Sequence, residues 1–186
     1  MSSLYEKPID RKAVYKGKVL DLYVDTVELP NGESAIREMC EHVGAVAVIA
    51  LTDDGRVVME RQYRHPHGRV FLEIPAGKLN SKDENHLEAA ARELREETGA
   101  VASELIFLSE IDTTPALIDE KIYLYLARGL SFGERSLDDD EFLDVELIPL
   151  KELVEMVKDG TIKDAKTVIA ILRAALVEGV TSEGEK

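Results

Sequence analysis

The chain has 186 residues, of which 37 are acidic and 23 basic, so its formal net charge at pH 7 is −14. This length suits one globular domain with a sizeable core, and the negative charge argues against nucleic acid as a partner, which needs basic patches. There is no apolar run near 18 residues, no signal-peptide layout, and a single cysteine, Cys40. We therefore expect a cytoplasmic protein that forms no disulfide within the chain and has no membrane partner.

The N-terminal region is predicted to form an antiparallel hairpin. Residues 13–29 have an extended pattern, and residues 33–42 supply a second strand. Between them stands Asn31-Gly32, the strongest short signal for a two-residue hairpin turn. The second strand is therefore expected to pair back on the first.

The next region is predicted to supply the centre of a sheet. Residues 45–51 are a nearly continuous apolar run, which is typical of a central strand. Asp54-Gly55 indicates a second hairpin turn, which leads into a strand over residues 56–64.

A helix is predicted after this sheet region, capped by Asp83 and ended by Gly99. Strands are expected over residues 103–111, 121–127 and 143–147. Two further helices follow, over residues 150–158 with Gly160 as the stop, and from the cap Asp164 through 177 with Gly179 as the stop. The predicted class is α+β, with a mixed sheet and helices packed on it. The stripe expected to be buried on the first helix is Leu87, Ala90, Ala91 and Leu94.

The first predicted helix carries an unusual group of acidic side chains. Glu93 and Glu97 stand four residues apart on one face, with Glu96 three residues after Glu93. Like charges at this spacing cost about 0.2–0.5 kcal/mol in an isolated helix, whereas a divalent cation such as Mg²⁺ favours converging carboxylate oxygens. The group therefore indicates either a metal site or an ordinary solvated face. On the helical wheel, Glu93 and Glu97 fall beside the apolar stripe, at the rim of the core.

The surrounding pattern resembles the Nudix box, in which a glycine and a glutamate precede Arg-Glu-apolar-x-Glu-Glu-x-Gly. Six fixed positions of this kind match by chance on the order of 10⁻⁷ per window. The gap from the first glycine to the first glutamate is one residue longer than usual, and the extra residue falls in a loop, where insertions are tolerated. The positions that carry the resemblance are Gly77, Glu84, Arg92, Glu93, Leu94, Glu96, Glu97 and Gly99.

The resemblance implies a Nudix-type α/β/α sandwich and metal-assisted hydrolysis of a diphosphate. Mg²⁺, for which Mn²⁺ could substitute, would be held by Glu93 and Glu97 with help from Glu96 and the Ala76 carbonyl group, while Arg92 would orient the glutamates. The general base of such enzymes comes from a loop after the box. Two residues match that place, Glu141 and Glu120, and Glu141 is favoured because it stands just before the next strand.

Features outside the box resemble the ADP-ribose pyrophosphatase subfamily. Pro115 lies 16 residues after Gly99, and Arg37 and Arg64 stand where this subfamily contacts its substrate. Guanidinium groups suit phosphate oxygens, although each arginine could equally form a surface ion pair. The expected substrate is a nucleoside diphosphate derivative, ADP-ribose, cleaved to AMP and ribose 5-phosphate. The alternatives are another nucleotide sugar such as GDP-mannose, or a non-catalytic nucleotide-sugar sensor.

The resemblance also implies a domain organisation. Residues 1–43 are expected to be an N-terminal β extension that forms a homodimer, residues 44–180 the Nudix hydrolase domain, and residues 181–186 a disordered tail. Because tryptophan is absent, an adenine ring could stack only on tyrosine or phenylalanine. The candidates in the extension are Tyr5, Tyr15 and Tyr23, each of which could instead pack in the core or at the dimer interface.

Overall fold

The computed structural model describes residues 4–180, which fall into two compact units. The N-terminal unit contains residues 4–44 together with 112–121, and the main unit contains residues 45–111 together with 122–180. Segment 112–121, expected in the domain of residues 44–180, belongs instead to the N-terminal unit, where Cys40 donates its N–H to the Leu117 carbonyl group at 2.7 Å. The tail expected at residues 181–186 lies outside the described residues.

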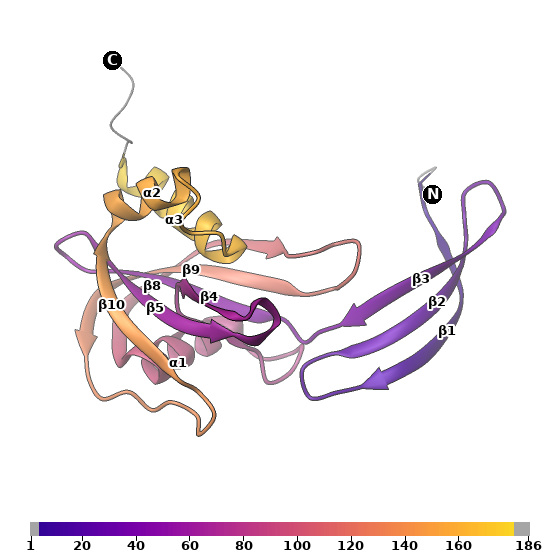
Figure 1. Ribbon diagram of the computed structural model, residues 1–186, viewed down its shortest axis with the longest axis horizontal. Coiled ribbons are helices and arrows are strands. Elements are labelled where there is room, and N and C mark those ends of the chain that lie inside the picture. The colour runs from indigo at the N-terminus through magenta and orange to yellow at the C-terminus, as the bar shows by residue number, and fades with distance from the viewer. Residues whose placement is uncertain (1–3, 181–186) are drawn as a thin grey trace, which may run out of the picture. The chain divides into compact units, whose positions relative to one another are not determined.

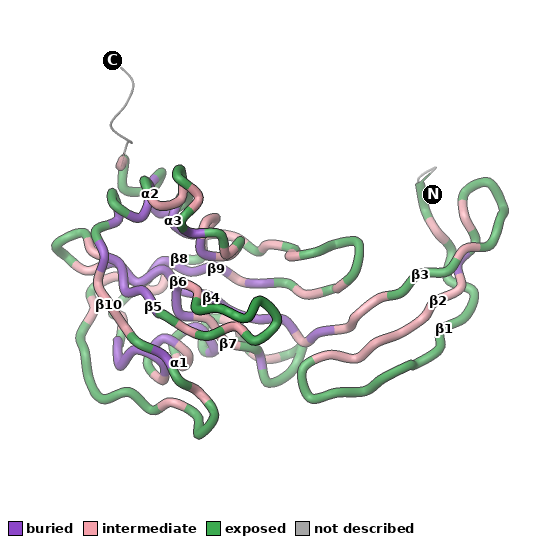
Figure 2. The backbone as a smooth tube through the Cα atoms, viewed as in Figure 1, coloured by how far each residue is buried: buried purple, intermediate pink, exposed green. Residues whose placement is uncertain are grey.

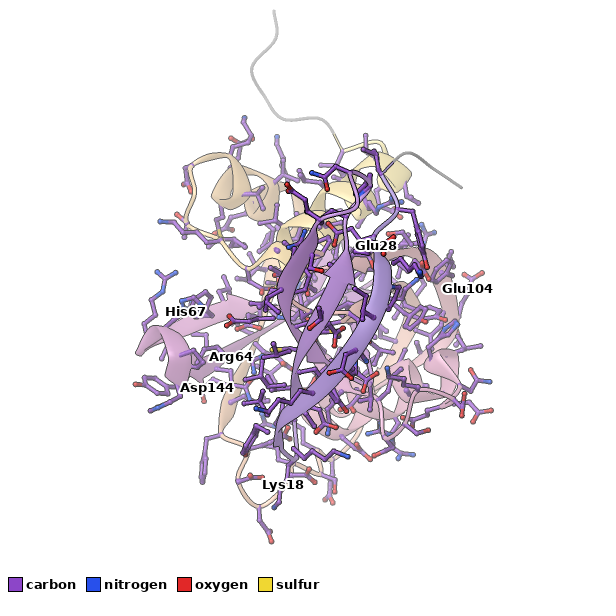
Figure 3. All side chains as sticks on the ribbon, turned by 90° about the vertical axis from the view of Figure 1, so that its right-hand side faces the viewer. Lys18, Glu28, Arg64, His67, Glu104 and Asp144 are labelled. Carbon is purple, nitrogen blue, oxygen red and sulfur yellow. The ribbon has the colours of Figure 1, made fainter. Side chains whose placement is uncertain are left out.

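The N-terminal unit is built on a three-stranded antiparallel sheet, β1 (Lys7–Lys16), β2 (Asp21–Glu28) and β3 (Ser34–Glu41), in that spatial order. A hairpin does form at Asn31-Gly32, but its loop spans residues 30–32 rather than two residues: the Leu29 N–H donates to the Glu33 carbonyl group, and the N–H of Gly32, which has φ 86°, donates to the Leu29 carbonyl group. The prediction of one continuous strand over residues 13–29 was wrong. The chain turns back between β1 and β2, where Gly17 donates to the Leu20 carbonyl group and to the Asp21 carboxylate. Figure 3 labels Lys18 in this turn and Glu28 at the far end of β2, and Figure 2 shows β1 exposed along its length.

The main unit contains a mixed seven-stranded sheet, which confirms the predicted fold class. β4 runs parallel to β9 and antiparallel to β5. Two short strands lie off the main path: β6 (Arg69–Glu73) pairs with β5 and β7 (Ala76–Lys78) pairs with β4, and the 3-10 helix η1 (His65–His67) connects β5 to β6. The five strands of the main path, in spatial order, are β10 (Leu143–Pro149), β5 (Arg56–Arg64), β4 (Ala45–Leu51), β9 (Lys121–Phe132) and β8 (Ala100–Asp112).

Helices cover both faces of this sheet (Figure 1). α2 (Leu150–Lys158) and α3 (Ala165–Glu178) lie on one face, where Ile49, Met59 and Leu124 form a buried core with them. α1 (His86–Thr98) packs on the opposite face, against β4 and β7. Because successive side chains of a strand point to opposite faces, Val48 and Val58 face α1 rather than α2 and α3. No helix within residues 4–180 is long and apolar enough to cross a membrane.

The ends of α1 explain where its functional residues stand. Asn85, not Asp83, is the N-cap, because its side chain accepts hydrogen bonds from the N–H groups of Leu87 and Glu88. The helix ends as predicted at Gly99, which has φ 72° in the left-handed region that glycine adopts without strain. The buried stripe was partly mispredicted: Leu87 and Ala91 are exposed, because the face turned to the sheet carries Ala89, Ala90, Leu94 and Glu97 instead.

The last two helices agree with the sequence. α2 spans the predicted residues 150–158, and Asp164 caps α3 by accepting from the Thr167 N–H. Thr167 also accepts a hydrogen bond from the Ile74 N–H at 3.1 Å, which ties α3 to the end of β6. The chain between β6 and β7, which leads into the glutamate helix, is thereby held from the α3 side.

Candidate active site

Glu97 points from α1 into the protein, and only 3% of its surface is exposed. Its Oε2 accepts a hydrogen bond from the Ala76 N–H at 2.9 Å. Ala76 begins β7, so this bond joins the glutamate helix to the sheet at the Gly-containing strand. Glu97 and Ala76, two of the predicted metal-binding residues, are therefore neighbours.

Glu93 lies one helical turn before Glu97, against the backbone of Gly77. A Cβ atom added at Gly77 would lie 2.0 Å from Glu93 Cδ and 2.2 and 2.3 Å from its two carboxylate oxygens. A side chain at residue 77 would therefore fit only if the Glu93 carboxylate moved away. The glycine of the sequence motif is thus required by the close approach of a carboxylate to β7.

Arg92 connects the remaining glutamates of the motif. Its guanidinium group contacts Glu93 at 2.8 Å, Glu96 at 3.0 Å and Glu84 at 3.5 Å. Glu84 also accepts from the Asn80 backbone and side chain, which closes the longer loop before α1. Arg92 therefore links three carboxylates, one of which, Glu93, lies against β7.

A pocket of about 220 Å³ opens beside these carboxylates. Glu141 lines it from the loop after β9, and this loop is anchored on α1 because the Ser136 N–H donates to the Glu96 carbonyl group at 2.9 Å. The other predicted base, Glu120, belongs to the N-terminal unit, where it accepts from Thr113 at 2.9 Å. The residues lining the pocket are Gly77, Lys78, Asn80, Arg92, Glu93, Glu96, Ser136, Asp138 and Glu141.

Glu60 on β5 was missed by the sequence analysis. It is as buried as Glu97, and its Oε1 has no hydrogen-bond partner among residues 4–180. Burial and the neighbouring Glu73 raise the pKa of Glu60, and burial together with Glu60 and Glu93 raises the pKa of Glu97. The available signal was a charged residue directly after Val57-Val58-Met59 in a strand, where alternation places it on the face covered by α1.

The excess of buried negative charge suits a divalent cation. Burial also raises the pKa of Glu93, and the nearby carboxylates of Glu96 and Glu141 act in the same direction against the effect of Arg92. Carboxylate oxygens in this number are what a hard cation such as Mg²⁺ binds. Within residues 4–180, however, no three His, Cys, Asp or Glu side chains already form a closed metal cage.

The two predicted substrate arginines are both engaged in ion pairs. Arg64 donates two 2.8 Å hydrogen bonds to Glu73 from the end of β5, where Figure 3 labels it close to His67 of η1. Arg37 lies in the N-terminal unit and pairs with Glu6, its Nε donating at 2.9 Å. Their exposed side-chain fractions are 39% and 45%, so both guanidinium groups remain reachable from solvent.

Glu73 anchors a buried charge network behind Arg64. It also pairs with Lys166, which contacts Asp164 at 2.9 Å. Burial alone would raise the pKa of Glu73, but the hydrogen bonds and charges of Arg64 and Lys166 outweigh it and lower the pKa. This network fixes the ends of β5, β6 and α3 beside the glutamate cluster.

The chain matches the NUDIX domain over residues 41–170. It is 43% identical over 185 residues to the ADP-ribose pyrophosphatase of Bacillus subtilis (strain 168), a match that covers 98% of this chain and 100% of that protein. It is also 44% identical over 183 residues to a methanol dehydrogenase activator of Bacillus methanolicus, covering 97% and 98% of the two chains. A crystal structure of an ADP compounds hydrolase has the same fold, with a TM-score of 0.83 at 23% identity over 96% of this chain and 98% of that one.

Proposed function

This chain belongs to the Nudix hydrolase family, as its glutamate motif predicted, and we propose that it hydrolyses the diphosphate bond of ADP-ribose to give AMP and ribose 5-phosphate. The observation that carries the proposal is the pocket where Glu93, Glu96 and Glu141 meet beside Gly77, with Glu97 buried at β7. The full-length similarity to an ADP-ribose pyrophosphatase supports the choice of substrate. The enzyme acts in the cytoplasm.

Glu93 and Glu97 hold Mg²⁺, assisted by Glu96 and the carbonyl group of Ala76, and Mn²⁺ can replace it. When bound, the cation neutralises the diphosphate and acts as the Lewis acid of the reaction. Arg92 keeps the carboxylates of Glu93 and Glu96 oriented through its contacts at 2.8 and 3.0 Å.

Glu141 is the general base that accepts the proton of the attacking water. It lines the pocket, whereas Glu120 lies in the N-terminal unit, 3.4 Å from His42 Nδ1 and hydrogen-bonded to Thr113. Glu120 is therefore the second choice for this role. The loop that carries Glu141 is held on α1 by the Ser136–Glu96 hydrogen bond, which keeps the carboxylate near the glutamate cluster.

Arg37 and Arg64 bind the phosphate oxygens of the substrate. A guanidinium group has five N–H donors, and in Arg64 only Nε and Nη2 are used by Glu73. The Arg37 guanidinium group donates hydrogen bonds to the Glu6 carboxylate and to the Ile36 carbonyl group, both near the surface. Arg64 thus keeps free N–H donors beside its pair with the buried Glu73, and both arginines keep a positive charge within reach of solvent.

The N-terminal extension, residues 1–43, assembles the homodimer, and residues 44–180 carry the hydrolase activity. In the sheet of this extension, several large apolar residues have more than half of their surface exposed, and a partner copy would cover them. These are Ile9, Val14, Tyr15 and Ile36. Light scattering coupled to size exclusion is expected to give twice the monomer mass of 20.7 kDa, and a monomer at micromolar concentration would reject this part of the proposal.

Steady-state rates with Mg²⁺ on ADP-ribose, GDP-mannose, ADP-glucose, diadenosine polyphosphates and 8-oxo-dGTP test the proposal. We expect the highest kcat/KM for ADP-ribose. A preference for GDP-mannose would replace the substrate but keep the reaction. No turnover of any compound would reject the hydrolase activity and leave a nucleotide-sugar sensor.

A second candidate comes from the methanol dehydrogenase activator, which is as similar to this chain as the pyrophosphatase. In that case the chain would raise the activity of a dehydrogenase. Adding wild-type chain or the Glu97→Gln variant to a purified methanol dehydrogenase separates the cases. Stimulation by the wild type alone would show that activation uses the hydrolytic site, and no stimulation would remove this candidate.

A further inference from the structure

Two glutamates directly opposite each other on neighbouring strands have opposite environments. Glu60 on β5 pairs in register with Glu73 on β6, and both side chains are buried to 3% exposure. Glu73 receives hydrogen bonds from Arg64 and Lys166. Glu60 Oε1 receives none from the described residues.

Such an unpaired buried oxygen is costly. Removing a carboxylate from water without a partner costs several kcal/mol, so buried charges in proteins are paired or bind metals. A position of this kind on a strand would ordinarily hold an apolar residue like its neighbours Val57, Val58 and Met59, which are fully buried. A carboxylate there calls for a partner, and no group within residues 4–180 donates to its Oε1, since the nearby cations Lys166 and Arg64 are bound by Glu73.

The direction of the Glu60 side chain identifies the partner. Met59 belongs to the core under α2 and α3, so the alternation of a strand turns Glu60 to the face that α1 covers. On that face, Glu60 is close enough to Glu97 and Glu141 for their charges to interact. Glu60 thus faces the side of α1 that carries the glutamate cluster.

We propose that Glu60 is a further carboxylate of the divalent-cation site, where its free oxygen binds the cation or its hydration shell together with Glu97. This inference rests on the proposed function, which assigns the cation to Glu93 and Glu97. It extends the site from the helix of the Nudix motif to strand β5, outside that motif. It also gives the unpaired Oε1 its missing partner.

Calorimetric titration of the full chain with Mn²⁺ tests this assignment. Glu60→Gln keeps the shape of the side chain and removes its charge, and we expect it to weaken Mn²⁺ binding at least about tenfold, the loss typical of outer donors of a metal site. Glu60→Asp keeps the charge and withdraws the oxygen by one methylene group, and it is expected to weaken binding as well. Glu146→Gln, on the neighbouring strand β10, removes one charge outside the cluster and is expected to bind as the wild type does.

Thermal unfolding adds a readout independent of turnover. Without cation, Glu60→Gln is expected to be at least as stable as the wild type, because a neutral amide replaces a carboxyl group whose charged form is disfavoured by burial. With Mn²⁺, its gain in Tm is expected to be smaller, because weaker binding stabilises less.

The outcomes separate this inference from the proposed function. If Glu60→Gln and Glu60→Asp bind Mn²⁺ like the wild type while Glu97→Gln does not, the role of Glu60 is overturned and the proposed site stands. If Glu60→Asp alone binds normally, Glu60 acts only through its distant charge, which also overturns the inference. If Glu97→Gln too binds normally, or the wild type binds no Mn²⁺, the proposed metal site itself is wrong. Should Glu60→Gln fail to fold, the result with Glu60→Asp decides.

Discussion

The approach of Glu93 to Gly77 gives the sharpest test of the site's geometry. In Gly77→Ala, the new methyl group would stand 2.0 Å from Glu93 Cδ, whereas carbon atoms in contact prefer about 3.5–4.0 Å. The atoms in conflict all belong to the end of one flexible side chain. The carboxylate, rather than the backbone, is therefore expected to move, by about 1.5 Å.

A displacement of this size has a calculable effect. Misplacing a catalytic group by about 1 Å can cost about 100-fold in rate, which corresponds to about 2.7 kcal/mol of activation free energy. We expect kcat for ADP-ribose at saturating Mg²⁺ to fall about 100-fold, with Tm little changed. Gly133→Ala is the matched control, because its Cβ would meet only the Gly99 carbonyl oxygen at 3.8 Å, and it is expected to keep full activity. Normal kcat in Gly77→Ala would refute the reasoning, and so would a loss of rate explained by unfolding.

Three further predictions concern the base, the buried network and the start of α1. Glu141→Gln is expected to lower kcat at least about 100-fold and Glu120→Gln much less; the reverse order in steady-state assays would move the base to Glu120. Lys166→Met is expected to cost about 3 kcal/mol in urea unfolding at neutral pH, because Glu73 loses the more buried of its two cationic partners; a loss below about 1 kcal/mol would show that Arg64 alone suffices. The pKa of Glu73 is lowered in the folded state, so the stability that its ion pairs contribute is complete above its unfolded-state pKa near 4.5 and is lost as the pH falls through its folded-state pKa. The difference in unfolding free energy between wild type and Lys166→Met is therefore expected to shrink in acid. A difference independent of pH would contradict the pairing. Asn85→Ala is expected to remove about 1 kcal/mol by deleting the N-cap, whereas Asp83→Ala changes little; equal losses would contradict the assignment of the cap.

The sequence predicted those parts of the molecule that depend on local pattern. The apolar run at residues 45–51 forms the central strand, Asn31-Gly32 forms a hairpin turn, and Gly99 ends the glutamate helix. The spacing of Glu93 and Glu97 placed both at the rim of the core; the structure buries Glu97 there and leaves the Glu93 side chain 12% exposed. Each of these features depends on a few residues that are close in the sequence, so it can be predicted without knowing the tertiary contacts.

The features that were missed either lack a strong local signal or depend on contacts distant in the sequence. The turn between β1 and β2 has no Asn-Gly signal and is closed by the Asp21 side chain on the Gly17 N–H. Segment 112–121 joins the N-terminal unit through hydrogen bonds with Cys40, more than 70 residues earlier in the chain. Glu60 resembled a surface residue because a charged residue in a strand is usually exposed. Only the packing of α1 on the sheet reveals that it is buried.

The most direct test of the account is a phosphorus NMR time course of ADP-ribose with Mg²⁺, comparing the wild type with Glu97→Gln. The account predicts that the wild type converts the diphosphate signals into those of AMP and ribose 5-phosphate. Glu97→Gln, which retains the hydrogen bond from the Ala76 N–H through its side-chain oxygen, is expected to stay folded and lose most of this rate. Equal rates in the two proteins, or products other than two monophosphates, would contradict the claim that this glutamate helix is the site of diphosphate hydrolysis.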